Sequence, residues 1–162
     1  MNRARPEQPP AANLENDPVA VTIYHLTVRW GECDPAGIVF YPNFFSYFDQ
    51  ASWNVFAQVG ITRPVMIERF GIVGIPLVDA QASFKWPCRF GDRLEIESHV
   101  SEWSTKSFTL QHRIRNGDRE AVEGYEVRIW GSKHPEDPNR LKALPVPKEV
   151  VTAVNEGTIL RE

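Results

Sequence analysis

The residues best suited to chemistry lie in one segment, Gly31–Pro42, with the sequence GECDPAGIVFYP. It holds two carboxylates, Glu32 and Asp34, among glycines and prolines that favour a structured loop. A carboxylate can attack a carbonyl carbon directly, or it can take a proton from an attacking water. A helical pattern follows the segment at once, and the first N–H groups of a helix are unpaired and can stabilise an oxyanion. The spacing therefore suits attack on a carbonyl group at a helix N-terminus.

The helix that must supply those donors is predicted over Asn43–Val59. Pro42 or Asn43 suits its start, and Gly60 suits a left-handed C-cap. Apolar residues and one serine recur at spacings of three and four, which is typical of a helix that is mostly buried. The stripe consists of Phe44, Phe45, Phe48, Ala51, Ser52, Val55, Phe56 and Val59.

Strands are predicted on both sides of this helix in the sequence. Val21–Trp30 has strand composition before it, and four stretches after it alternate apolar and polar residues: Leu77–Trp86, Arg93–Trp103, Lys106–Arg115 and Ala121–Trp130. Short connections between them, one of which contains Asn116-Gly117, predict an antiparallel sheet. Because so apolar a helix must be enclosed, the simplest architecture is α+β, with one curved sheet wrapped around the helix.

Three further segments complete the prediction. Arg63–Phe70 and Pro147–Asn155 are expected to form short helices, and His134–Pro147 is rich in proline and expected to be irregular. Residues 1–18 have almost no large apolar side chains, so they are predicted to form a disordered N-terminal tail. Residues 19–162 then form a single domain, which suits a chain of 162 residues.

Composition excludes several classes of protein. A net charge of -3 and a pI near 5.8 argue against a nucleic-acid partner. Two cysteines without a CxxC pattern argue against a disulfide framework and against a zinc site. Neither a signal-peptide core nor an apolar run of ~20 residues occurs, so no membrane partner is expected and a cytoplasmic location is predicted.

The segment Trp30–Asp49 resembles the 4-hydroxybenzoyl-CoA thioesterase family of acyl-CoA thioesterases, which have the hotdog fold. The resemblance rests on the string DPAGIVFYPN at residues 34–43 and on Asp49, seven residues after Pro42. It continues through Gly71–Gly74, Ala82–Phe84 and Glu102–Phe108. It implies a hotdog fold, a homodimer or homotetramer with sites between subunits, and hydrolysis of a small-molecule acyl-CoA substrate without cofactor or metal.

The resemblance also implies roles for single residues. Asp34 matches the family's catalytic aspartate, as nucleophile or as general base, and the backbone N–H of Tyr41 matches the donor that faces the thioester carbonyl. Glu32 is expected to be a surface or supporting group. A nucleophilic Cys33 is the weaker hypothesis, because none of the four histidines lies in a recognisable hydrolase signature. Substrate contacts are expected from Gly37, Asp49, Ile75, Lys106 and Ser107.

Two departures from the family pattern bear on the substrate. Ile75 stands where the nearest relatives carry a hydroxyl-bearing residue, so the acyl group can be 4-hydroxybenzoyl, benzoyl, another aryl group or a short aliphatic chain. Ser104 and Thr105 stand where arginines are expected to bind CoA phosphates, which leaves Lys106. The residues considered as replacements are Arg89, Arg113, Arg115, Arg128 and Lys133. The predicted function is aryl-CoA hydrolysis, with a short-chain thioesterase or a non-catalytic acyl-CoA-binding module as alternatives.

Overall fold

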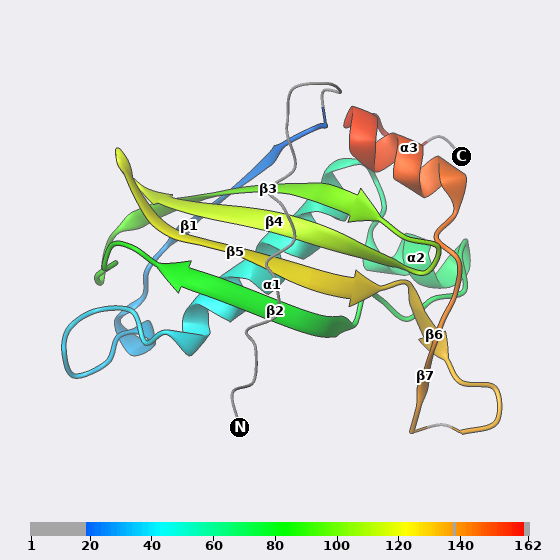
Figure 1. The fold of residues 1–162 in the computed structure, drawn as a ribbon, viewed down its shortest axis with the longest axis horizontal. Coiled ribbons are helices and arrows are strands. Elements are labelled where there is room, and N and C mark those ends of the chain that lie inside the picture. Colours follow the sequence, from blue (N-terminus) through cyan, green and yellow to red (C-terminus); the bar gives the residue numbers. More distant parts are fainter. Residues whose placement is uncertain (1–18, 138, 161–162) are drawn as a thin grey trace, which may run out of the picture.

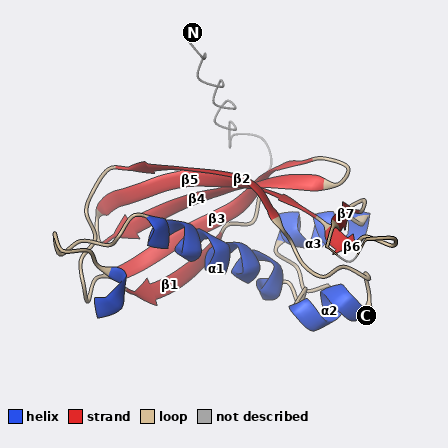
Figure 2. Cartoon of the chain, turned by 90° about the horizontal axis from the view of Figure 1, so that it is seen from below, coloured by secondary structure: helices blue, strands red, loops and turns tan. Residues whose placement is uncertain are grey.

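A five-stranded antiparallel sheet dominates the computed structural model, which describes residues 19–137 and 139–160. The predicted disordered tail of residues 1–18 lies outside the described residues. The strand order is β1-β3-β4-β5-β2, and the long helix α1 lies along one face of the sheet (Figures 1 and 2). The predicted α+β architecture is therefore confirmed. The strands are β1 (Thr22–Thr27), β2 (Leu77–Phe84), β3 (Arg93–Trp103), β4 (Ser107–Asn116) and β5 (Arg119–Ile129).

Helix α1 spans Pro42–Gln58, with Tyr41 as N-cap and Pro42 in the first turn. Proline suits this position because its missing N–H would have no partner there. The chain leaves the helix through Gly60, whose φ of 80° is the left-handed conformation predicted for it. Most of the predicted stripe is buried, but Phe45 is only half-buried, and the buried Tyr47 was not predicted.

The Phe48 ring of helix α1 packs against Gly124 of β5. A Cβ atom there would lie 2.2 Å from the Gln81 carbonyl oxygen and 2.7 Å from the Phe48 ring. His112 of β4 is the cross-strand partner of Gly124. The Phe48 ring stacks on His112 with 4.6 Å between ring centroids and 13° between planes. Glycine at 124 therefore leaves room for the Phe48 ring to lie directly on the sheet.

Two hydrophobic clusters make up the core, one under each half of α1. The first turns of α1 pack with residues of β3, β4 and β5, including Leu94, Ile96 and Ile114. The last turns pack against α2 (Arg63–Glu68) and α3 (Lys148–Glu156), which cover that end of the sheet. Both short helices were predicted within two residues of their bounds.

Some predicted boundaries are wrong. Strand β1 ends at Thr27 rather than Trp30, and Trp30–Glu32 forms a 3₁₀ turn. Beyond Thr27 the chain bonds to the turn before β3 instead of the strand, because Val28 exchanges hydrogen bonds with Gly91 and Asp92. The segment predicted as irregular contains β7 (Leu141–Ala143), which pairs with β6 (Gly131–Lys133). Each has only three residues, too few for a detectable alternation.

Candidate active site

The segment that carries Asp34 closes on itself. The Asp34 N–H donates to the Ile38 carbonyl at 2.9 Å, and the Gly37 N–H donates to the Asp34 carbonyl at 2.9 Å. Gly37 has φ +75°, a left-handed conformation that side chains rarely adopt. Cys33 and Val39 form an isolated β-bridge across the base of the loop. Asp34 therefore sits in an ordered loop of fixed shape.

The Asp34 carboxylate is half-buried and is held by only one of its two oxygens. Oδ1 accepts a hydrogen bond from the Ala36 N–H at 2.8 Å, the ordinary Asx turn of an aspartate in a loop. Among the described residues, Oδ2 has no hydrogen-bond or ion-pair partner. One oxygen thus fixes the side chain, while the other remains available to attack a carbonyl or to accept a proton.

The first turn of α1 has one backbone donor without an acceptor. The Asn43 N–H donates to the Phe40 carbonyl at 2.9 Å, the Phe44 N–H donates to the Tyr41 carbonyl at 3.1 Å, and Pro42 has no N–H. The Tyr41 N–H has no acceptor within residues 19–137 and 139–160. The unpaired donor at this helix N-terminus is therefore the Tyr41 N–H, which is also the donor that the family resemblance implies.

Glu32, which was expected to be a surface or supporting group, joins the Asp34 loop to α1. Its carbonyl accepts from the Phe40 N–H and from Asn43 Nδ2, each at 2.8 Å. Its Oε2 accepts from the Tyr47 hydroxyl at 2.9 Å and from the Arg29 N–H at 2.6 Å. Burial and the Glu32 carboxylate together raise the pKa of Tyr47 far above its ordinary value. The only sequence signal for Tyr47 was its place beside Phe44 and Phe48 on the helix.

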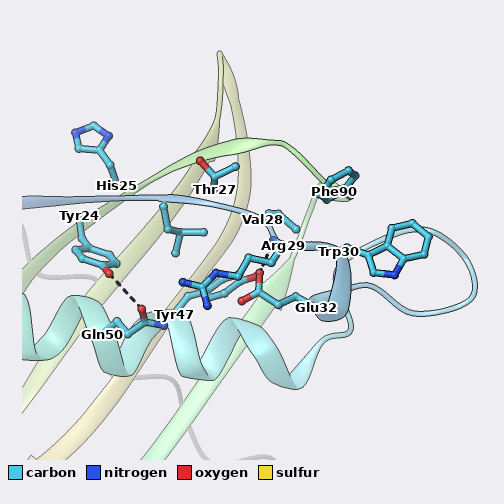
Figure 3. Close-up of a pocket in the computed structure, with 11 residues that line it drawn as sticks. Tyr24, His25, Thr27, Val28, Arg29, Trp30, Glu32, Tyr47, Gln50 and Phe90 are labelled. Carbon is cyan, nitrogen blue, oxygen red and sulfur yellow. Dashed lines mark hydrogen bonds between the residues drawn. The ribbon is translucent and has the colours of Figure 1, made fainter.

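A cavity of about 510 Å³ lies between β1 and α1, beside the Glu32–Tyr47 pair (Figure 3). The Tyr24 hydroxyl donates to Gln50 Oε1 at 3.1 Å across it. Neither Asp34 nor Tyr41 lines this cavity. The lining residues are Tyr24, His25, Leu26, Thr27, Val28, Arg29, Trp30, Glu32, Tyr47, Gln50 and Phe90.

The cysteine hypothesis gains no support from the structure. Cys33 Sγ contacts the Arg29 carbonyl at 3.9 Å, and no histidine in the described part of the chain bonds to it. Burial, reinforced by the nearby Asp92 charge, raises the pKa of the Cys88 thiol to about 12. Cys88 is therefore an unreactive core residue.

Two residues expected to contact the acyl group, Asp49 and Ile75, meet at one guanidinium group. Arg128 Nη2 donates to Asp49 Oδ1 at 2.6 Å, and Arg128 Nη1 donates to the Ile75 carbonyl at 2.9 Å. The Asp49 side chain is 51% exposed, whereas the Ile75 side chain is buried in the core. The suggestion that Arg128 binds CoA phosphate is wrong, because it is buried and bonded internally.

Behind Arg128, a chain of polar groups continues into the core. Arg128 Nε and Nη2 donate to the two oxygens of Glu126 at 3.0 and 2.9 Å. Glu126 Oε2 also accepts from Ser52 Oγ at 2.5 Å and lies 3.3 Å from His112 Nε2. Ser98 Oγ lies 2.7 Å from His112 Nδ1. These partners assign His112 the neutral form with its proton on Nε2.

The charge states in this network follow from its hydrogen bonds. Burial lowers the pKa of His112 and keeps the ring neutral, although Glu126 opposes that shift. Burial alone would raise the pKa of Glu126, but hydrogen bonds from His112, Arg128 and Ser52, with the Arg128 charge, lower it to about 2. Glu126 and Arg128 are therefore a buried ion pair, which the sequence analysis missed because both look like surface positions of a strand.

Lys106 and Ser107 lie far from the Asp34 loop within the chain. Lys106 belongs to the turn after β3 and Ser107 begins β4, whereas the Asp34 loop lies at the end of the sheet where β3 starts (Figure 1). The eleven residues of β3 span roughly 36 Å at about 3.3 Å per residue. The structure therefore does not bring these two parts of the predicted site together in a single chain.

Another residue that was considered for the phosphate contacts, Arg113, already forms ion pairs within the chain. Arg113 pairs with Glu97 at 3.5 Å and with Glu120 at 3.0 Å.

Within the described chain, no group of three or more His, Cys, Asp or Glu residues is placed to hold a metal ion. None of its helices is long and apolar enough to cross a bilayer.

Comparison with known proteins now identifies the family. The family model described as the thioesterase-like superfamily matches residues 28–154. This chain belongs to that superfamily. It is 37% identical over 131 residues to the 4-hydroxybenzoyl-CoA thioesterase of Pseudomonas sp. strain CBS-3, a match that covers 76% of this chain and 90% of that protein. It is 29% identical to a 1,4-dihydroxy-2-naphthoyl-CoA hydrolase of Thermosynechococcus vestitus, over 65% of this chain and 73% of that one.

Solved structures agree with this membership. The structure of the Pseudomonas 4-hydroxybenzoyl-CoA thioesterase aligns with a TM-score of 0.75 at 33% identity, covering 82% of this chain and 97% of that one. A gentisyl-coenzyme A thioesterase aligns with a TM-score of 0.71 at 33% identity, covering 81% and 99%. The expected hotdog fold and the resemblance to the 4-hydroxybenzoyl-CoA thioesterase family are thereby confirmed.

Proposed function

We propose that this protein hydrolyses an aryl-CoA thioester to the free acid and CoA, with Asp34 and the Tyr41 N–H as its catalytic groups. One observation carries the proposal. In the part of the chain that the structure describes, a closed loop holds a carboxylate with one free oxygen, and the helix that follows begins with one unpaired backbone donor. A carboxylate and an oxyanion donor are the two groups that attack on a thioester carbonyl requires.

The reaction can then follow either of two routes. Asp34 can attack the carbonyl carbon, so that the C–S bond breaks, CoA leaves as the thiolate and water hydrolyses the resulting anhydride. Alternatively, Asp34 takes a proton from a water molecule that attacks the carbonyl itself. In both routes the carbonyl oxygen becomes negative, and the Tyr41 N–H at the positive end of the α1 dipole stabilises it.

Exposed aromatic side chains beside Tyr41 support an aryl acyl group. The Phe40 and Tyr41 rings are 5.4 Å apart, and the Tyr41 and Phe84 rings are 6.3 Å apart. All three side chains are exposed, and such rings favour contacts with other aromatic groups. The relatives named above act on 4-hydroxybenzoyl, dihydroxynaphthoyl and gentisyl thioesters, which are all aryl groups.

An oligomer completes the proposed site. Within the described residues, β2 pairs with β5 alone, and it carries the exposed Leu77, Val78 and Phe84, followed by the exposed Trp86. Pairing two copies would cover such an edge. Because Lys106 lies far from Asp34 in one chain, the turn that binds CoA is expected from another subunit. A homodimer or homotetramer follows, with no cofactor.

Thiol release from a panel of CoA thioesters tests the proposal. We expect benzoyl-CoA and 4-hydroxybenzoyl-CoA to be hydrolysed with kcat/KM values within about two decades of each other, because Ile75 offers no hydroxyl partner. Phenylacetyl-CoA and butyryl-CoA serve as comparison. A clear preference for butyryl-CoA would favour the short-chain alternative. Tight binding of all four without thiol release would favour the non-catalytic module.

A further inference from the structure

We propose that Arg128 is a positioning residue that fixes the Asp49 carboxylate for a polar substituent on the acyl group; this inference rests on the proposed function. The observation behind it is that one buried guanidinium contacts both the acid of α1 and the backbone carbonyl of Ile75. Both Asp49 and Ile75 are positions where the family resemblance implies a contact with the acyl group. Arg128 therefore controls the geometry of both.

The hydrogen bonds of Arg128 determine the direction of its side chain. Its Nε and Nη2 form a two-point contact with Glu126, which sets the plane of the guanidinium. Nη1 then reaches the Ile75 carbonyl, and Nη2 also reaches Asp49. A flat group with donors in fixed directions can hold three acceptors at once, whereas a lysine ammonium on a flexible stem cannot hold the same arrangement.

Packing alone does not account for this arrangement. Removing an ion pair from water is costly, and well-packed apolar residues in the same volume often give equal or greater stability. Arg128 is only 3% exposed, yet its last contact, Asp49, is 51% exposed. The buried ion pair thus ends at a carboxylate that solvent or a ligand can reach.

The Asp49 carboxylate has one oxygen to offer a ligand. Oδ1 is bonded to Arg128, while Oδ2 has no partner in the described residues. A carboxylate oxygen accepts hydrogen bonds and repels other anions. The held carboxylate therefore favours acyl groups that carry a hydroxyl and disfavours acyl groups that carry a second carboxylate.

Substrate ratios test this inference. The ratio of kcat/KM for 4-hydroxybenzoyl-CoA to that for benzoyl-CoA is measured for wild type, Asp49→Asn, Arg128→Lys and the double variant. We expect each single change to lower the ratio roughly tenfold, the loss expected of one hydrogen bond to a charged group. The double variant should lower it no further than Asp49→Asn alone, because both changes remove the same contact.

Ser98→Ala is the matched control. Ser98 belongs to the same buried network but lies at its far end, bonded to His112. This change should lower the melting temperature and leave the substrate ratio within twofold of wild type. If Arg128→Lys does not fold, Glu126→Gln removes the charge of the carboxylate that aligns Arg128 while keeping its shape, and the same fall in ratio is expected.

Three results would overturn the inference. They are an unchanged ratio in Asp49→Asn, an unchanged ratio in folded Arg128→Lys or Glu126→Gln, and additive effects in the double variant. Failure of the proposed function looks different, since wild type would then hydrolyse neither thioester. In that case the ratio of dissociation constants for the two thioesters replaces the kinetic ratio, and the same variants decide the role of Arg128.

Discussion

The Tyr47 hydroxyl donates a 2.9 Å hydrogen bond to the Glu32 carboxylate, which links the second turn of α1 to the residue two places before Asp34. The same carboxyl oxygen accepts from the Arg29 N–H, and the Glu32 carbonyl accepts from Phe40. Glu32 is therefore bonded to residues both before and after the Asp34 loop. The relative position of Asp34 and the Tyr41 N–H depends on this residue.

We expect Tyr47→Phe to lower kcat several-fold and to lower the free energy of unfolding by about 1 kcal/mol, the usual net contribution of one hydrogen bond. The ring stays in place, but the loop loses one of its links to α1. Steady-state kinetics and chemical denaturation measure the two effects. Tyr24→Phe is the matched control, because its hydroxyl bonds Gln50 on the other side of the same cavity. Equal behaviour of the two variants would show that Glu32 does not position the loop.

Asp34→Asn is expected to lower kcat by two or more decades without a loss of fold. The asparagine oxygen can still accept from the Ala36 N–H, so the Asx turn is kept. An amide is neither a good nucleophile nor a base. Turnover within threefold of wild type, at an unchanged melting temperature, would remove Asp34 from the mechanism. Cys33→Ala should retain wild-type activity.

The active protein is expected to sediment as a dimer or tetramer of the 18.5 kDa chain. Mixing also tests whether sites are shared between subunits. Asp34→Asn and Lys106→Ala are each expected to be weakly active, and subunit exchange between them rebuilds one intact site in each mixed dimer. Activity should then rise to roughly a quarter of wild type. A fully active monomer, or no gain after exchange, would contradict the shared site.

Acid is expected to destabilise the fold in two steps. The pKa of His112 is lowered by burial, so the unfolded chain binds a proton that the folded chain does not, and stability falls as pH drops below 6.5. The pKa of Glu126 is about 2 against 4.5, so its contribution is complete above 4.5 and is lost between 4.5 and about 2. His99, whose pKa burial also lowers, acts in the same direction as His112.

Melting temperature against pH checks this expectation. His112→Gln should flatten the change just below pH 6.5 and leave the lower step, which belongs to Glu126. The remaining slope of melting temperature against pH near pH 6 then comes from His99, and the His99→Gln variant measures this contribution separately. An unaltered profile in His112→Gln would mean that this histidine does not control acid stability.

The sequence was informative where a pattern reports burial directly. The spacing of Phe44, Phe48 and Val55 located α1, and Gly60 located its end. Strand β5 shows why the rest was not accessible. Hydrophobic alternation alone would bury Tyr125, Val127 and Ile129, yet the structure buries the opposite face, with Glu126 and Arg128. Charges can occupy that face only because partners from α1 and β4 meet them, and those partners are distant in the sequence.

Residues of the candidate site could be predicted only where they belong to one continuous segment of the sequence. The Asp34 loop is contiguous in the sequence, so a family resemblance was enough to propose Asp34 and Tyr41 as catalytic groups. Arg128 and Tyr47 act through contacts with other residues, and no local motif marks them.

Beyond the buried Val122, β5 presents Gly124, Glu126 and Arg128 in succession on the same face, so this part of the strand offers α1 polar groups rather than an apolar surface. Placing α1 on this part of β5 before the ion pair is formed is unfavourable, because the unpaired charges would lose their water. Attachment of the helix to this part of β5 and alignment of the charges are therefore coupled. A helix shifted by one turn would leave Arg128 without Asp49 and Glu126 without Ser52. The polar residues of β5 therefore select one position of α1 along the sheet, whereas the apolar strands on either side would accept several.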